Sequence, residues 1–136
     1  MDTGAEQAAR ESIAVFRRAL AHPTEGLFSS SPLMRLGLIL NKTGRSREGE
    51  SYIRQSLAIR THLLAPGNQL IGATQGALGE CLTTQKRYAE AEPLLLESYR
   101  IFKSTASEQD PHRMEARQRL KALYEAWHKP EKAVSY

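Results

Sequence analysis

The sequence predicts an all-α solenoid built of antiparallel helix pairs, and three observations support this fold class. A leucine-centred motif recurs every 42 residues, at Leu36, Leu78 and Leu120, and repetition at constant spacing is typical of repeat architectures. Apolar side chains recur at helical spacing through most of the chain. The sequence has neither a sustained alternation of apolar and polar residues nor an Asn-Gly or Asp-Gly hairpin turn.

The 136-residue chain has the length and composition of one soluble domain. It is 40% hydrophobic and 25% charged, which is typical of globular proteins rather than disordered segments. It has no apolar run long enough to span a membrane. The N-terminal residues lack the basic and apolar regions of a secretory signal. We therefore expect a single domain over residues 1–136, in a cytoplasmic protein without a membrane partner.

Residues 5–22 are predicted to form a helix that resembles the second helix of a pair. Ile13, Phe16 and Leu20 lie on one side of it, and further apolar residues lie on other sides. No first helix precedes it, so we interpret residues 5–30 as a half repeat.

Residues 31–67 are predicted to form the first full repeat. Ser31-Pro32 resembles a helix start, since serine caps helices and proline is tolerated at the first helical position. This helix is expected to end near Gly44. A second helix would carry Gly49, Ile53 and Leu57 inward and end before Pro66.

Residues 68–109 repeat this plan, with helices expected over 68–84 and 88–103. Leu78, Cys81 and Leu82 would face inward from the first helix, and Ala91 and Leu95 from the second. Pro93 falls inside the second helix. Because an interior proline removes a backbone hydrogen bond, we expect this helix to begin late or to bend there.

Residues 110–136 are predicted to form an incomplete terminal repeat. Asp110-Pro111 supplies a cap and a first-turn proline for a helix that reaches about Trp127. This helix would bury an apolar face that comprises Met114, Leu120, Leu123 and Tyr124. A short helix would follow from Lys129-Pro130.

The repeated motif resembles the tetratricopeptide signature, a helix pair with Leu-Gly-x-x-Tyr in its first helix and Ala-x-x-x-Phe in its second. Leu36-Gly37-x-x-Leu40 and Leu78-Gly79-x-x-Leu82 match the first block, and Ala91-x-x-x-Leu95 matches the second. The resemblance implies a right-handed superhelix. The 42-residue spacing, with the run from Tyr88 to Leu94, is similar to the kinesin-light-chain-like subclass. The stretch 76–96 also resembles arrays attached to bacterial serine/threonine kinases.

The first helices depart from that subclass, which commonly carries asparagines that bind peptide backbone. Here the corresponding blocks are residues 33–37, 75–79 and 117–121, and none contains asparagine. The known ligands of the subclass are therefore not carried over to this chain.

The residue pattern offers little support for catalysis, a metal or a cofactor. The four histidines are dispersed, and Cys81 lies on an apolar helix face. Glu90 and Glu92 are two residues apart on a helix, so they point to different faces. The glycines between Gly67 and Gly79 spell no phosphate-binding loop. We expect a non-catalytic scaffold that binds a peptide or a partner domain.

The resemblance places the first helix of each pair along a concave groove, and the register gives the positions that face it. Met34 and Leu38 would be apolar anchors, Asn41 a hydrogen-bonding group and Lys42 a steering charge. The full set of predicted partner-binding residues is Met34, Leu38, Asn41, Lys42, Gly76, Glu80, Thr83, Thr84, Gln118, Ala122 and Glu125.

Three alternatives stay open at the sequence level. The first alternative is that the chain is a regulatory segment of a larger enzyme, such as a bacterial serine/threonine kinase. Residues 1–77 carry nine basic against six acidic residues, and this excess motivates a weaker nucleic-acid-binding hypothesis. The apolar residues of the open N-terminal repeat also suggest self-association.

Overall fold

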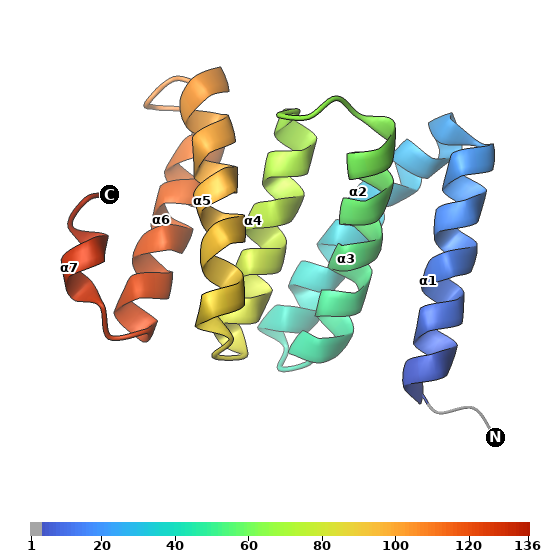
Figure 1. Cartoon of the computed structure of the whole chain (residues 1–136), viewed down its shortest axis with the longest axis horizontal. Helices are drawn as coiled ribbons and strands as arrows, with labels where there is room; N and C mark the ends of the chain where they lie inside the picture. Colours follow the sequence, from blue (N-terminus) through green and yellow to red (C-terminus); the bar gives the residue numbers. More distant parts are fainter. Residues whose placement is uncertain (1–3) are drawn as a thin grey trace. The chain divides into compact units, whose positions relative to one another are not determined.

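The computed structural model describes the backbone of residues 4–136 and the side chains of residue 11 and residues 13–136. This part of the chain forms seven helices and no strand (Figure 1). The predicted all-α class of antiparallel helix pairs is confirmed. The chain divides into two compact units, of which one ends at Ala65 and the next begins at Pro66.

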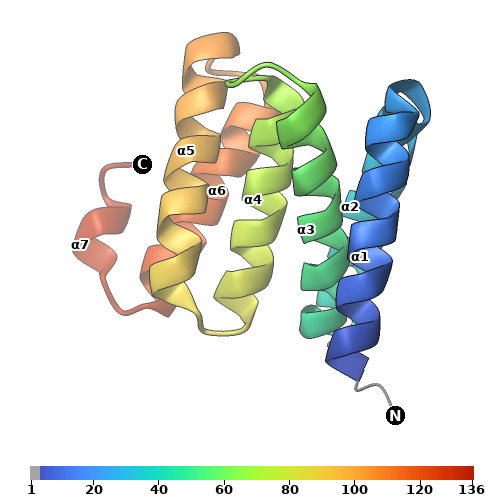
Figure 2. The ribbon, with the colours of Figure 1, turned by 45° about the vertical axis from the view of Figure 1, so that its right-hand side comes forward.

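The N-terminal unit contains α1 (Gly4–Ala21), α2 (Pro23–Lys42) and α3 (Ser46–Leu63). Helices α2 and α3 form an antiparallel pair, and α1 packs against both (Figure 2). The two helices approach closely at two glycines: a Cβ on Gly37 would lie 2.6 Å from the carbonyl oxygen of Gly49. Small residues at these two positions therefore set the distance between the helices.

Helix α2 begins at Pro23, so the predicted start at Ser31-Pro32 was wrong. Pro23 occupies the first helical position, and Glu25 lies in the first turn. Pro32 lies inside the helix, where proline costs about 3 kcal/mol. Tertiary contacts hold the helix together around it. The Ser56 hydroxyl donates a hydrogen bond to the carbonyl oxygen of Ser30 at 2.7 Å, and Arg60 Nε donates one to the Ser30 hydroxyl at 3.0 Å.

The C-terminal unit contains α4 (Gln69–Thr84), α5 (Tyr88–Thr105), α6 (Pro111–Ala126) and α7 (Pro130–Ala133). Helix α6 packs against both α4 and α5, and α7 packs against α6. The side chains of Asn68 and Asp110 cap α4 and α6, because each accepts a hydrogen bond from the backbone N–H two residues later, at 2.8 Å.

Two expectations in the C-terminal unit concern Pro93 and Met114. Helix α5 begins at Tyr88, so Pro93 does not delay its start, and a bend at Pro93 stays a prediction. Pro93 is exposed, and its ring removes one backbone donor without entering the core. Met114 was expected inside, but it is exposed, whereas Leu120, Leu123 and Tyr124 are buried as predicted. Met114 lies in the first turn of α6, next to the loop that precedes this helix.

The 42-residue register is visible in the helix bounds and in single atoms. Helices α1, α3 and α5 have equal lengths and begin 42 residues apart, at Gly4, Ser46 and Tyr88. The Ser56 hydroxyl donates to the carbonyl oxygen of Ser30, and the Ser98 hydroxyl donates to that of Gly72, both at 2.7 Å. Equivalent side chains therefore make equivalent contacts in the two units.

No helix in the described part of the chain is both long and apolar enough to cross a membrane.

Candidate functional site

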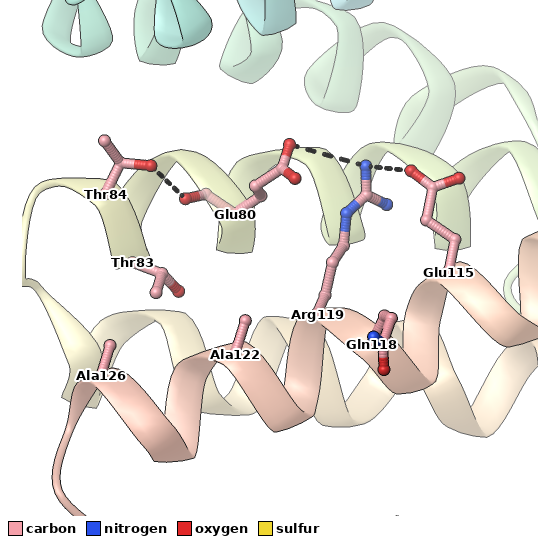
Figure 3. Close-up of a pocket in the computed structure, with 8 residues that line it drawn as sticks. All are labelled: Glu80, Thr83, Thr84, Glu115, Gln118, Arg119, Ala122 and Ala126. Atoms are coloured by element: carbon pink, nitrogen blue, oxygen red, sulfur yellow. Dashed lines mark hydrogen bonds and ion pairs between the residues drawn. The ribbon is translucent and has the colours of Figure 1, made fainter.

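A pocket of about 510 Å³ opens between α4 and α6, within the C-terminal unit. Helix α4 contributes two threonines and a glutamate, and α6 contributes charged, amide and alanine side chains (Figure 3). The lining residues are Glu80, Thr83, Thr84, Glu115, Gln118, Arg119, Ala122 and Ala126. Its volume lies within the range of pockets that bind small ligands or peptide side chains.

Arg119 is the most buried charged side chain of the pocket, with only 11% of it exposed. Its Nη2 lies 2.7 Å from Glu115 Oε1 and 3.8 Å from Glu80 Oε2 (Figure 3). Gly76 makes room for this guanidinium, because a Cβ there would lie 2.7 Å from Arg119 Nη1. Arg119 Nε is buried and has no hydrogen-bond partner among the residues that the structure describes.

The rest of the lining combines hydrogen-bonding groups with a small apolar surface. The Thr83 hydroxyl donates to the carbonyl oxygen of Gly79 at 2.8 Å, and the Thr84 hydroxyl donates to that of Glu80 at 3.1 Å. Each hydroxyl oxygen keeps acceptor capacity after donating its proton. Ala122 and Ala126 are exposed and small, so they leave room for a side chain of a bound partner.

A tetratricopeptide repeat family model matches residues 28–104 and again residues 70–136. The two matches together span well over half of the chain. The chain belongs to the tetratricopeptide repeat family. Members of this family generally mediate protein–protein interactions. A search of curated proteins found no match.

Five of the predicted partner-binding residues of this tetratricopeptide repeat chain lie together in the α4–α6 pocket: Glu80, Thr83, Thr84, Gln118 and Ala122. Gly76 is buried beneath Arg119, so its surface is covered rather than presented. Glu125 is exposed on the same helix but does not line the pocket.

The four predicted residues of the N-terminal unit have different surroundings. Asn41 is buried, and its Oδ1 accepts from the Ser46 hydroxyl at 2.7 Å, so this amide stabilises the α2–α3 turn. Met34 is half-buried, and its sulfur lies 3.5 Å from Arg60 Nη1. Leu38 is half-buried and Lys42 is exposed. Partner binding by these four residues stays a prediction.

Sequence reasoning missed Glu115, Arg119 and Ala126, which complete the lining. A signal for them existed, because Glu115 and Arg119 are spaced i, i+4 on one helix and can pair across one turn. Ala126 likewise follows Ala122 by four residues. The tetratricopeptide motif specifies residues on the buried helix faces, whereas Glu115, Arg119 and Ala126 are not motif positions.

Proposed function

We propose that the α4–α6 pocket binds a peptide segment of a partner protein and that this chain acts as a non-catalytic scaffold. The observation that carries the proposal is the Arg119 guanidinium, which lies in the pocket lining next to Glu80 and Glu115 and keeps 11% of its side chain exposed. A guanidinium has five N–H donors, so Arg119 can donate a hydrogen bond to a peptide carbonyl oxygen as well as pairing with these carboxylates.

The composition of the pocket also supports peptide binding. A peptide backbone presents acceptors and donors in alternation, and the pocket offers N–H donors on Arg119 and Gln118 and acceptors on Glu80 and Glu115. The lining includes neither histidine nor cysteine. The two carboxylates approach the same guanidinium, so we assign them a binding role rather than a catalytic one.

Two of the alternatives keep their separate tests. A role beside a kinase domain stays a prediction that the flanking gene sequence would test. Nucleic-acid binding through the basic excess of residues 1–77 also stays a prediction, which the absence of any binding to single- or double-stranded nucleic acid at low salt would contradict.

A bead-bound library of acetylated and amidated hexapeptides tests the proposal. We expect the wild-type chain to retain a subset of the peptides. The Ala122→Arg variant should bind the selected peptides at least about ten-fold more weakly, a loss of about 1.4 kcal/mol, because the new side chain fills the pocket.

Ala89→Arg is the matched control, because Ala89 is exposed on α5 and lies outside this pocket. It should bind like the wild type. Equal binding by the wild type and Ala122→Arg, or the absence of any selected peptide, would contradict the proposal.

A further inference from the structure

The charges of the α4–α6 pocket are unequal in number and in exposure. Two carboxylates line it against one guanidinium. The side chains of Glu80 and Glu115 are 36% and 55% exposed, whereas that of Arg119 is 11% exposed. The positive charge is therefore held deep, and the negative charges are the more accessible to an arriving partner.

A third carboxylate extends this negative surface along α6. Glu115, Gln118, Ala122 and Glu125 recur at spacings of three and four residues, so they share one face of the helix. Glu125 is exposed. The basic residues Arg117 and Lys121 do not line the pocket, so Arg119 is the only cation in its lining.

We propose that this pocket selects a partner peptide by a Lys or Arg side chain, which lies against Glu80 and Glu115 while a neighbouring backbone carbonyl accepts a hydrogen bond from Arg119. This inference rests on the proposed function, and it names the chemistry of the partner. The aliphatic stem of the lysine or arginine would pack on Ala122 and Ala126.

An acidic segment fits the same pocket poorly. Arg119 already lies between two carboxylates, at 2.7 and 3.8 Å, so a third carboxylate would meet excess negative charge. A cationic side chain instead balances the charge of the pocket. Because hydrogen bonds to charged groups are stronger than neutral ones, the cation supplies selectivity and the backbone carbonyl supplies register.

The selectivity is measured with a positional-scanning version of the hexapeptide library, in which one position at a time is fixed. We expect Lys or Arg at one position to be preferred over Glu by at least about ten-fold, a difference of about 1.4 kcal/mol. The preference should weaken as salt is raised, because partly exposed charges are screened.

Glu80→Gln and Glu115→Gln keep side-chain size while removing one charge each. Each variant should lower the preference for Lys or Arg, and the double variant should abolish it, while peptides with a neutral residue at that position bind as before. Glu108→Gln is the matched control, because Glu108 is exposed in the loop between α5 and α6 and does not line the pocket. It should leave the preference unchanged.

The outcomes separate this inference from the proposed function. Selected peptides that depend on Ala122 but show no preference for Lys or Arg, or prefer acidic residues, would overturn the inference and leave the proposed function standing. A preference for Lys or Arg that survives the double variant would also overturn it. Peptide binding that is insensitive to Ala122→Arg would overturn the proposed function itself.

Discussion

At the scale of single residues, small side chains at equivalent repeat positions, Gly49 and Ala91, allow paired helices to approach each other closely. A Cβ on Gly49 would collide with the carbonyl oxygen of Gly37. Ala91 stands 42 residues later and is fully buried on the matching helix. Close packing of this kind tolerates few added atoms, so the column is explained by helix contact rather than by a binding role.

Tyr124 gives a prediction about pH. The pKa of Tyr124 is raised above its ordinary value of 10.0. Burial is the larger cause, and the second is the 2.8 Å hydrogen bond that the Tyr124 hydroxyl donates to Glu92 Oε2. The folded chain holds this proton more tightly than the unfolded chain does. The stabilisation is complete below about pH 10 and is lost as the pH rises towards the higher pKa of the folded state.

Denaturant unfolding followed by the fluorescence of Trp127, the chain's one tryptophan, measures this effect. We expect the free energy of unfolding of the wild type to fall as the pH rises above about 10, and that of Tyr124→Phe to fall less. At neutral pH the variant should be less stable by about 1–3 kcal/mol, since it loses a hydrogen bond to a charged group. Parallel pH profiles for both proteins would contradict the assignment.

At the scale of elements, the turns between paired helices place one residue in the left-handed region in every repeat. Gly44 has φ of 84°, Lys86 has 62° and His128 has 58°, and the three positions are 42 residues apart. Glycine adopts this conformation without strain, whereas other residues pay a steric cost. The first turn is therefore relaxed and the other two are strained.

A pair of alanine variants tests this difference. Gly44→Ala should lower the free energy of unfolding by about 1 kcal/mol, because alanine is strained at positive φ. A Cβ at this position has open space around it, so no collision adds to the loss. Lys86→Ala is the matched control and should change stability little, since the native residue already bears the strain. A similar loss in both variants, measured in urea, would contradict this view.

The sequence predicts elements well where the start and end signals are local. The caps Asn68 and Asp110 and the break at Pro66-Gly67 place α4 and α6 to within one residue at their starts. The predicted start of α2 was wrong because the sequence offers two proline-containing helix starts, at Pro23 and at Pro32. Contacts between Ser30 and α3 favour the earlier start. Such contacts involve residues far apart in the chain, and local propensity does not record them.

The candidate site was predicted in part for a related reason. The register identifies which α4 and α6 positions share a face, and five of those positions line the pocket. It does not describe how far a long side chain reaches, so Arg119 was missed although it fills the space above Gly76. The register also does not reveal that the Asn41 side chain accepts a hydrogen bond from Ser46 across the α2–α3 turn.

At the scale of the whole molecule, helix α2 of the N-terminal unit exposes three large apolar side chains. Helix α2 exposes 77% of Phe28 and 59% of Ile39, with Leu36 between them on the same face. Helix α1 exposes Ile13 and Leu20. In the 42-residue register, Leu36 and Ile39 correspond to Leu120 and Leu123 of α6, which are buried, whereas Phe28 corresponds to the exposed His112. Helix α5 packs on α6. The α2 face therefore has the apolar character of a surface that another helix covers.

This α2 face predicts concentration-dependent self-association of the chain. Light scattering over a concentration series should show an average mass that rises above that of the monomer, because burial of exposed apolar side chains favours association in water. The double variant Phe28→Ser, Ile39→Ser should stay monomeric over the same series. Leu96→Ser is the matched control, because it removes an exposed leucine from α5, and it should associate like the wild type. A wild-type chain that remains strictly monomeric, or a double variant that associates as strongly as the wild type, would contradict the role given to the α2 face.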